Sequence, residues 1–515
     1  MTEKQEVKPF FRISQDGAKE ATVSQYSAHI KRLRSTFAAG RTRPLAWRIR
    51  QLEALKSFLT DNYEALITAL YCDLRKGRLE AIIFEVDFVL NDINGALMNI
   101  GIWAQPEPIP RTLMTLIDTS TLHSEPLGLV LLLGAWNYPV QITLSPLVGA
   151  IAAGNCVVIK PSEQSPATAA LLERLKSYLD NEAFLIVNGG VEEATELLKE
   201  RYDIIFYTGS VNVGKIIYAA AQKYLTPVVL ELGGKSPVYI HPDVDLGITT
   251  RRVLWGKFVN AGQTCVAPDY VICHEQIYDQ FISTAKRIIR EFFGDDPKSS
   301  PDFGRIVTTG HAERLVRLMR GADIVVGGIA DPDNRYVAPT IVKNVQGSDP
   351  LMQEEIFGPI LPVMKVKGLD DAIQFINSRD KPLTAYLFAR DQRVISLFTS
   401  ETSSGSLCIN DVLVHLSNEG LPFGGVGTSG MGRYHGKYTF DCFSNKKAVM
   451  QRDFSYIGEI VGKKRYPPYT EKNLQLFKII LKRRGRLLGP FRPFVLPLFW
   501  ATIGILFYRY LLRFL

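Results

Sequence analysis

The chain has 515 residues, which is too many for one compact core. Hydrophobic residues make up 46% and charged residues 22%, a composition typical of globular proteins that argues against disorder. Its net charge of +8 is concentrated at one end: residues 451–515 hold thirteen Lys/Arg and three Asp/Glu, a net of +10, and the first 450 residues carry −2. A nucleic-acid-binding protein would carry its basic patch on a folded domain, so the distribution predicts no nucleic-acid partner and a tail that contacts an anionic surface.

The spacing of the cysteines and histidines bears on metal binding and on the redox environment of the protein. The six cysteines include no CxxC pair, and the seven histidines show no HExxH or His–Cys ligand spacing, so we predict no metal site. Since no apolar N-terminal segment suggests a signal peptide, a reducing cytosolic environment is favoured. The length predicts two or three domains.

In chain order, residues 1–23 are polar and are expected to form a loose leader. From Ser24 to about Gly77, apolar residues recur at helical spacing and predict two or three amphipathic helices. A third apolar stretch runs from Ile82 to Trp103, until prolines stop it. The threonine-rich segment 111–126 predicts an exposed strand pair.

Short apolar runs then alternate with helical stretches. The runs predict strands at 129–133, 157–159, 184–187, 204–207 and 228–232. The stretches between them predict helices at 139–152, 165–179, 191–200 and 211–222. Buried strands that alternate with helices indicate a parallel sheet covered on both faces. A second region of this kind runs from about 235 to 410, and the glycine-dense segment 420–432 predicts a loop or close backbone packing.

Cys265 and Glu231 are the first candidates for chemistry. A lone cysteine is more often a small buried hydrophobe, but the neighbours Gly262, Gln263 and Thr264 are not typical of a core. A thiol nucleophile with a separately held carboxylate base suits chemistry through a thioester. The thiol needs a lowered pKa or a nearby base, and the absence of a neighbouring histidine other than His274 argues against a papain-like hydrolase.

The segment after the predicted strand 204–207 is a candidate phosphate site. A strand, a glycine turn and a helix that begins near Ser210 place free N–H groups at a helix N-terminus. Gly209 and Gly214 have GxxxxG spacing and not GxGxxG, and Lys215 is not followed by Ser or Thr, so neither the dinucleotide fingerprint nor a P-loop is met. A plain turn between strand and helix remains an alternative.

Two further candidates follow predicted strands. Lys160 and Glu163 come after the strand that ends at Ile159, where open α/β sheets bind ligands, and Glu163 has the chemistry to accept hydrogen bonds from ribose hydroxyls. Asn137 follows the first apolar strand, and its side-chain amide has the chemistry to donate to an oxyanion. The alternatives are a solvated charge pair and an ordinary turn before a helix that begins with Pro139.

Taken together, these segments resemble the NAD(P)-dependent aldehyde dehydrogenase family over about residues 24–450. The matching motifs are Trp136-Asn-Tyr-Pro139, Lys160-Pro-Ser-Glu163, Phe206-Tyr-Thr-Gly-Ser210, Glu231-Leu-Gly-Gly-Lys-Ser-Pro237, Gly262-Gln-Thr-Cys265, Glu354-Glu-Ile-Phe-Gly-Pro359, Pro422-Phe-Gly-Gly425 and Ser429-Gly-Met-Gly-Arg-Tyr-His-Gly436. The segments 267–270 and 433–438 resemble the class 3 branch. Arg465-Tyr-Pro-Pro468, followed by an apolar tail, resembles its membrane-bound fatty aldehyde dehydrogenases.

The resemblance implies an α/β fold with two Rossmann-like parallel-sheet domains, a small β arm for homodimerisation and a membrane-associated tail. The expected boundaries are 24–110 with 127–233 for the cofactor-binding domain, 234–420 for the catalytic domain, 111–126 with 421–455 for the oligomerisation arm and C-terminal linker, and 465–515 for the basic helix and membrane anchor.

The resemblance also implies a catalytic role for three residues. Cys265 would attack an aldehyde to give a thiohemiacetal, and the Asn137 amide with the Cys265 backbone N–H would hold its oxyanion. After hydride transfer to the nicotinamide leaves a thioester, Glu231 would activate the water that hydrolyses it. Glu355 is an alternative base.

The implied cofactor contacts come from four segments. Lys160 and Glu163 would contact the adenosine ribose, and the turn with Gly209, Ser210 and Gly214 the pyrophosphate. Glu355 with Phe357 would contact the nicotinamide ribose. A carboxylate at position 163 disfavours a 2′-phosphate, so NAD is expected as the cofactor, with NADP as the alternative.

The tail predicts attachment to a membrane. Residues 474–480 and the basic residues around them indicate an amphipathic helix, and the fifteen residues 494–508 carry no charge. A full span needs about 20 apolar residues, so either the chain crosses with Arg509 and Arg513 at the far interface or a helix or hairpin lies in one leaflet. We expect a catalytic domain that faces the cytosol at the endoplasmic reticulum, a lipid droplet or the outer mitochondrial membrane.

Membrane attachment favours lipophilic substrates, with medium- to long-chain fatty aldehydes first. An apocarotenal or isoprenoid aldehyde fits the same pattern. Two other classes of protein stay open at this point. One is a cysteine hydrolase or acyltransferase without hydride transfer, and the other is a non-enzymatic membrane scaffold with the same fold.

Overall fold

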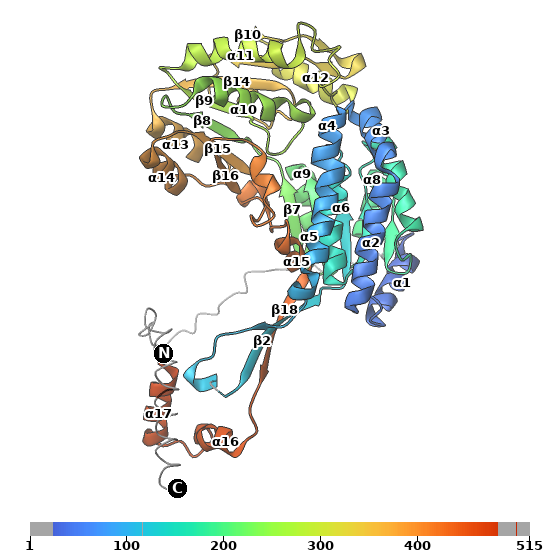
Figure 1. Cartoon of the computed structure of the whole chain (residues 1–515), viewed down its shortest axis with the longest axis vertical. Helices are drawn as coiled ribbons and strands as arrows, with labels where there is room; N and C mark the ends of the chain where they lie inside the picture. The colour runs from blue at the N-terminus through green and yellow to red at the C-terminus, as the bar shows by residue number, and fades with distance from the viewer. Residues whose placement is uncertain (1–23, 116, 483–500, 502–515) are drawn as a thin grey trace, which may run out of the picture. The chain divides into compact units, whose positions relative to one another are not determined.

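The computed structural model describes residues 24–115, 117–482 and 501. These fall into two compact units (Figure 1). Unit 1 comprises the described parts of Met1–Gln105 and of Ser124–Lys446, and unit 2 those of Pro106–His123 and of Lys447–Leu515. The expected leader 1–23 and the uncharged segment 494–508 lie outside the described residues.

Unit 1 begins with helices, as the apolar periodicity predicted. They are α1 (Ser27–Ala38), α2 (Leu45–Asp61), α3 (Tyr63–Leu74), α4 (Arg78–Ala81), η1 (Ile82–Val86) and α5 (Asp87–Trp103). The last of them ends before Pro106, where the prolines were expected to stop it. A single π-helical turn, η1, interrupts the run between α4 and α5. Such turns shift the direction in which side chains point and are frequent at functional sites.

A six-stranded sheet forms the first half of unit 1. Its strands, in the order β17-β7-β6-β3-β4-β5, are β3 (Leu129–Leu133), β4 (Cys156–Lys160), β5 (Phe184–Ile186), β6 (Ile204–Gly209), β7 (Val228–Leu232) and β17 (Gly430–Met431). All are parallel except β17, which pairs antiparallel with β7. Helices that follow these strands are α6 (Gln141–Ala153), α7 (Pro166–Leu172), η3 (Glu173–Ser177), α8 (Val191–Leu198) and α9 (Val211–Gln222). The predicted alternation is therefore confirmed within one or two residues for most elements.

A seven-stranded sheet forms the second half, in the order β10-β13-β14-β9-β8-β15-β16. Its strands are β8 (Pro237–Ile240), β9 (Tyr270–His274), β10 (Asp323–Val326), β13 (Thr340–Lys343), β14 (Ile360–Val366), β15 (Thr384–Phe388) and β16 (Ser406–Ile409). Only β10 runs antiparallel to its neighbour. The accompanying elements are α10 (Leu246–Phe258), η4 (Val259–Gly262), α11 (Tyr278–Phe293), α12 (Thr309–Leu318), β11 (Ala330–Asp331), η5 (Pro332–Asn334), β12 (Tyr336–Val337), η6 (Pro350–Met352), α13 (Leu369–Asn377) and α14 (Gln392–Glu401).

The strand order places a ligand site in the first sheet. From β3 the chain proceeds through β4 to β5 on one side, and then returns to add β6 and β7 on the other. The order therefore reverses between β3 and β6, and open parallel sheets bind ligands outside the carboxyl ends of their strands at such a point. The loops after β3, β6 and β7 contain Asn137, Ser210 and Gly233.

The segment 421–455 was expected to form part of the oligomerisation arm and the C-terminal linker, but its first half lies in unit 1. Gly430 and Met431 pair with β7 of the first sheet, and α15 (Lys437–Cys442) packs against α6, so both belong to unit 1. Gly430 makes this pairing possible, because a Cβ there would lie 2.1 Å from the Leu230 carbonyl oxygen. Two short turns, η7 (Val414–Ser417) and η8 (Gly427–Ser429), lie in the same part of the chain.

The arm itself is a three-stranded sheet in the order β1-β2-β18, made of β1 (Glu107–Pro108), β2 (Thr119–Pro126) and β18 (Ser444–Gln451). The expectation of a strand pair within 111–126 is wrong, since that segment supplies one strand and the turn η2 (Leu113–Thr115). The partners of β2 come from sequence-distant residues, which local pattern cannot identify.

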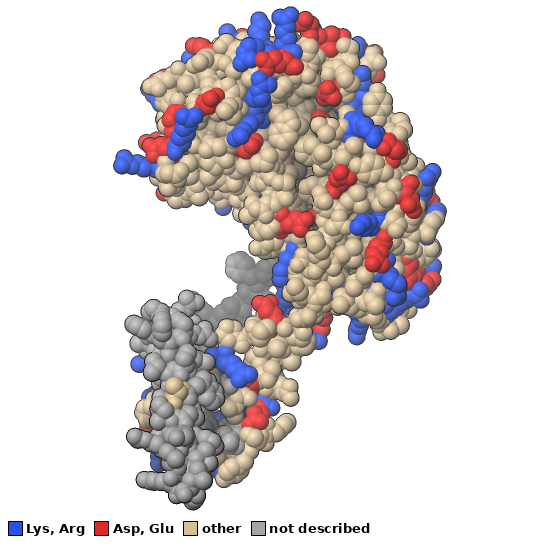
Figure 2. Space-filling view, viewed as in Figure 1, with Lys and Arg blue, Asp and Glu red and all other residues tan. Residues whose placement is uncertain are grey.

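Unit 2 also contains α16 (Tyr456–Gly462), η9 (Lys463–Arg465) and α17 (Glu471–Leu481). The last confirms a helix where the basic amphipathic segment was predicted. Within the described ranges, no helix combines the length and apolar character that a membrane crossing requires. On the visible face of unit 1, acidic and basic side chains are interspersed (Figure 2).

Candidate active site

The loop that carries Cys265 has an unusual backbone. After α10, Asn260, Ala261 and Gly262 take φ values of 53°, 52° and 77°, three successive residues in the left-handed region. Such conformations cost free energy in non-glycine residues and persist where the surroundings impose them. Gly262 has no alternative, because a Cβ there would lie 2.3 Å from the Gly358 carbonyl oxygen. This tight turn brings Cys265 to a cavity wall.

Asn137 is tied directly to the cysteine loop. Its Nδ2 group donates to the Gln263 carbonyl oxygen at 3.1 Å, two residues before Cys265. The Asn260 side chain completes the connection, since its Nδ2 donates to the carbonyl oxygens of Asn137 at 2.8 Å and of Gln263 at 3.1 Å. An amide nitrogen carries two hydrogens. Asn137 Nδ2 makes a single hydrogen bond within the described residues, so its second hydrogen is free to donate.

Two cavities meet at the predicted catalytic pair. One has a volume of 280 Å³ and the other 230 Å³. Thr208, Glu231 and Cys265 line both. A molecule in either cavity would therefore reach the same thiol and the same carboxyl group.

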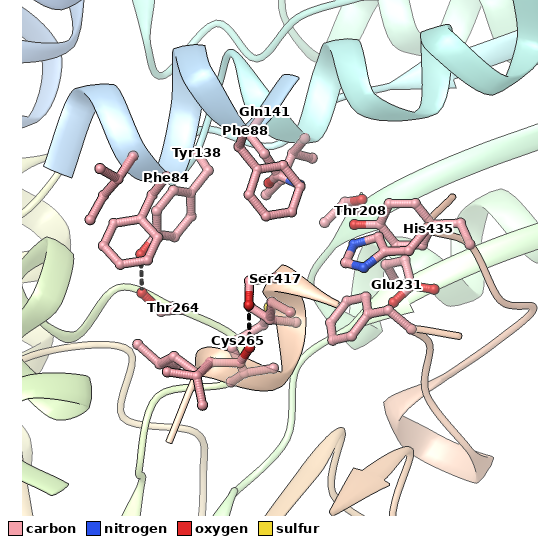
Figure 3. A pocket seen from close by; sticks show the side chains of 18 of the residues that line it. Phe84, Phe88, Tyr138, Gln141, Thr208, Glu231, Thr264, Cys265, Ser417 and His435 are labelled. Carbon is pink, nitrogen blue, oxygen red and sulfur yellow. Dashed lines mark hydrogen bonds between the residues drawn. The ribbon is translucent and has the colours of Figure 1, made fainter. Parts of the chain in front are cut away.

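The larger cavity is predominantly apolar. Aromatic rings from η1, α5 and α10 form one wall, and residues from the segment 413–435 form the other. Figure 3 shows Phe84, Phe88 and Tyr138 across the cavity from Cys265, with His435 beside Glu231. The Tyr138 and Thr264 hydroxyls lie 2.8 Å apart in a hydrogen bond, so these polar atoms are satisfied within the wall. The remaining apolar lining includes Ile83, Ile142, Trp255, Val266, Leu413, Val414, Leu416 and Phe423.

Glu231, at the carboxyl end of β7, is an isolated buried carboxyl group. It is 3% exposed, and neither of its oxygens has a hydrogen-bond partner among the described residues. Burial raises the pKa of Glu231 well above its ordinary value, an effect that the Arg433 charge only partly offsets. Burial likewise raises the pKa of the Cys265 thiol, and the charges of Glu355 and Glu231 add to the effect. Burial therefore favours the neutral form of both groups.

The smaller cavity has the character of a cofactor site. Its lining includes Trp136, Asn137, Gly209, Ser210, Leu232, Gly233, His311, Arg314, Glu355 and Phe357. Five of the predicted site residues besides Glu231 and Cys265 thus lie around one space. Trp136 meets His311 and Phe357 edge to face, with ring centroids 5.4 Å and 5.3 Å apart.

Glu355 lies on a loop held from two sides. Arg314 donates to the Glu354 carboxylate at 2.8 Å and to the Glu355 carbonyl oxygen at 3.3 Å. The Lys235 ammonium bonds the Asp269 carboxylate at 2.6 Å and the Glu354 carbonyl oxygen at 2.9 Å. Burial, followed by the Asp269 charge, raises the pKa of Glu355 to about 8.

The turn after β6 leads into α9 as predicted. Ser210 is the N-cap, and its Oγ accepts from the Val213 N–H at 3.4 Å. The N–H groups of the first turn face the carboxyl end of the sheet, where an anion is favoured. Gly209 leaves no room for a side chain, since a Cβ there would lie 2.1 Å from the Tyr207 hydroxyl. Gly214 differs: it packs α9 against Leu232 and does not line the cavity.

Lys160 and Glu163 form an ion pair of 3.3 Å at the carboxyl end of β4. Lys160 is buried, whereas the Glu163 side chain is 42% exposed. Neither lines the 230 Å³ cavity, although β4 is the neighbour of β3 in the sheet. The structure therefore places this pair one strand away from the residues gathered around Cys265.

Several lining residues were not identified from the sequence. Thr208 lies between the cavities with its Oγ1 buried and without a partner in the described part of the chain, and it belongs to a motif that was recognised. Tyr434 and His435 also lie in a recognised motif. Phe84 and Trp255 gave no signal, because an aromatic residue on an amphipathic helix is usually part of the core.

The geometry agrees with the comparison of the chain with known proteins. The family model described as aldehyde dehydrogenase family matches residues 3–449. The chain belongs to this family.

Particular relatives place the chain in its class 3 branch. It is 48% identical over 462 residues to aldehyde dehydrogenase family 3 member A2 of Rattus norvegicus, over 89% of this chain and 95% of the relative. It is also 48% identical over 451 residues to a Mus musculus protein named aldehyde dehydrogenase, dimeric NADP-preferring, over 87% and 99%. The structure of Staphylococcus aureus AldH in its substrate-bound state matches with a TM-score of 0.85 and 40% identity, over 88% of this chain and 99% of that one.

Proposed function

We propose that this aldehyde dehydrogenase oxidises medium- to long-chain aliphatic aldehydes to carboxylic acids with NAD. The observation that carries the proposal is the position of Cys265 where an apolar and a more polar cavity meet. An alkyl chain fits the apolar cavity, because burying each methylene contributes about 0.8 kcal/mol. The aldehyde carbon would then lie at the thiol.

Cys265 supplies the nucleophile in this account. Its sulfur attacks the aldehyde carbon, and the carbonyl oxygen becomes the oxyanion of a thiohemiacetal. The free hydrogen of the Asn137 amide and the backbone N–H of Cys265 would donate to that oxygen. Donors fixed in place stabilise developing charge without reorganisation, and the connection through Gln263 and Asn260 fixes this one.

The residues around the smaller cavity fit a nicotinamide dinucleotide. Gly209 has no side chain to keep a ligand from the backbone, the N-terminus of α9 favours a phosphate, and Glu355 would accept from a ribose hydroxyl. A bound nicotinamide would supply the hydride acceptor, so that loss of a hydride from the thiohemiacetal leaves a thioester on Cys265. Lys160 and Glu163 would contact the adenosine ribose from the neighbouring strand. The exposed Glu163 carboxylate disfavours a 2′-phosphate and so supports NAD, although one relative is named NADP-preferring.

Glu231 serves as the base for hydrolysis. Its oxygens accept no hydrogen bond from any residue that the structure describes, so its carboxylate is available to take a proton from the attacking water. Its raised pKa makes it a stronger base once it is ionised. Glu355, on the loop that Arg314 and Lys235 hold, is the second candidate for this base.

We also propose that the tail holds the enzyme at a membrane and that the β1-β2-β18 arm joins two copies. The described helix α17 has lysines beside exposed Leu474, Ile479 and Leu481, which suits the interface of an anionic bilayer. The arm leaves residues of β18 largely exposed, and a relative's name contains the word dimeric. The catalytic unit would face the cytosol at the endoplasmic reticulum, a lipid droplet or the outer mitochondrial membrane.

The reaction is tested by adding an aldehyde and NAD to the purified enzyme and recording the absorbance of reduced nicotinamide. Stoichiometric formation of NADH and the acid supports the proposal. Ester hydrolysis without aldehyde-dependent NADH formation would instead indicate a cysteine hydrolase or acyltransferase.

A further inference from the structure

A buried ion pair lies behind the predicted oxyanion donor. The side chains of Lys76 and Glu85 are 0% exposed, and Lys76 Nζ lies 2.5 Å from Glu85 Oε1. Removing two charges from water costs several kcal/mol, and apolar residues of similar size often fill such a place without loss of stability. A contribution to stability alone therefore does not explain why this ion pair is buried here.

Both members of the pair direct their remaining hydrogen-bonding capacity to one turn. Lys76 Nζ donates to the Asn137 carbonyl oxygen at 3.0 Å. Glu85 Oε2 accepts from the backbone N–H groups of Val140 at 3.0 Å and Gln141 at 2.9 Å. The turn that carries Asn137 is thus held at its beginning by a cation and at its end by a carboxylate.

Two other contacts act on the same turn. The Lys76 ammonium lies 4.0 Å from the centre of the Tyr138 ring. Asn260 donates to the same Asn137 carbonyl oxygen, from the side of the cysteine loop. The π-helical turn η1 supplies Glu85. Neither Lys76 nor Glu85 lines either of the two cavities at Cys265.

We propose that Lys76 and Glu85 are positioning residues that hold the Asn137 amide in line with the oxyanion formed at Cys265. The inference rests on the proposed role of Asn137. Loss of the pair lets the turn relax, so that the amide donates at a poorer distance and angle. A misplacement of about 1 Å at a reacting group can reduce the rate by about 10²-fold.

The effect is expected in kcat and not in the KM for the aldehyde, because the oxyanion exists only after attack. Lys76→Met alone leaves a buried carboxylate without its cation and risks misfolding. The paired variant Lys76→Met/Glu85→Leu removes both charges and keeps the side-chain volumes similar. Glu85→Gln is the milder second variant, since it retains one oxygen that can accept.

The decisive experiment is a double-mutant cycle in the full-length enzyme. Lys76→Met/Glu85→Leu and Glu85→Gln are each made alone and together with Asn137→Ala, and kcat and the melting temperature are measured. We expect the paired variant to lose about 10- to 100-fold in kcat with Asn137 present and less than about 2-fold without it. Equal losses in both backgrounds would overturn the proposal, as would an unchanged kcat in the paired variant.

Two controls separate positioning from general damage. Arg34→Met removes an ion pair with Asp203 whose N–O distance is 3.1 Å, at the amino end of β3, and is expected to leave kcat unchanged. The rate at which iodoacetamide alkylates Cys265 is expected to stay within about 2-fold in the paired variant, because alkylation needs no oxyanion donor; a collapsed rate would contradict the account.

If Asn137→Ala itself leaves kcat intact, the proposed function loses its oxyanion donor and the positioning role falls with it. A normal loss in Asn137→Ala with additive losses overturns the positioning role alone.

Discussion

Glu231 and Cys265 line the same two cavities, although they come from different halves of unit 1. Glu231 lies near the carboxyl end of β7 in the six-stranded sheet, and Cys265 follows the left-handed turn after α10. Burial raises the pKa of both groups, and the charges of Glu355 and then of Glu231 further raise the pKa of the thiol. Because both groups act in their deprotonated forms, we expect activity to depend on pH.

The first prediction concerns the dominant base. Burial raises the pKa of Glu231 and of Cys265, and both act in their deprotonated forms, so kcat is expected to rise with increasing pH. Glu231→Gln removes the base for thioester hydrolysis and lowers steady-state kcat by about 10²–10⁴-fold. Because acylation still proceeds, a burst of NADH equal to the enzyme concentration precedes the slow phase. A burst in Glu355→Gln and none in Glu231→Gln would assign the base to Glu355.

Glu355 leads to a second prediction. Its pKa is raised to about 8 by burial, so its carboxylate forms as pH rises through that value. A carboxylate accepts a stronger hydrogen bond from a ribose hydroxyl than the neutral acid does. The KM for NAD should therefore fall between about pH 7 and pH 9, and Glu355→Gln should flatten the profile. The dependence is measured by initial rates at saturating aldehyde, and a profile unchanged in the variant refutes this role.

The nucleophile is tested by comparing two cysteines. Cys265→Ser replaces the thiol with a hydroxyl, which has a much higher pKa and is far less nucleophilic, so aldehyde-dependent NADH formation should disappear. Cys72 is exposed and lies at the end of α3, so Cys72→Ser should retain full activity. Mass spectrometry after a short incubation with aldehyde and NAD should find the acyl adduct only on Cys265. An adduct elsewhere would contradict the assignment.

The strained turn gives a prediction about stability. Gly262→Ala places a Cβ against the Gly358 carbonyl oxygen and also imposes φ of 77° on alanine. Gly321 has a similar φ of 76° with open space around it, so Gly321→Ala carries only the conformational cost of about 1–2 kcal/mol. We expect Gly262→Ala to lower the free energy of unfolding by roughly 1–3 kcal/mol more than this control. Chemical denaturation measures the difference, and equal losses would show that the contact with Gly358 is relieved without cost.

The sequence predicts local elements well where one interaction dominates. Strands β3 and β7 have the predicted bounds, because each is a continuous apolar run between clear turns. Helix α9 also matches, since Ser210 caps it. In contrast, the pairing of β2 with β18 joins residues about three hundred positions apart, and nothing local encodes it.

The functional site likewise contains residues that sequence motifs identify and residues that they do not. The motifs identified Asn137, Cys265 and Glu231, and the fold brings them together. They did not reveal that Gly214 serves helix packing, because a glycine in a turn motif fits both roles. Nor did they reveal the pair of Lys76 and Glu85, in which both side chains are fully buried and Glu85 lies in a π-helical turn.

The central claim is that the apolar cavity at Cys265 selects long aliphatic aldehydes, and kcat/KM across a chain-length series with NAD tests it most directly. We predict that hexadecanal exceeds acetaldehyde by more than about 10-fold, since several buried methylenes at about 0.8 kcal/mol each outweigh the cost of ordering the chain. If kcat/KM for hexadecanal is equal to or below that for acetaldehyde, the cavity does not bind the chain and the substrate proposal is wrong.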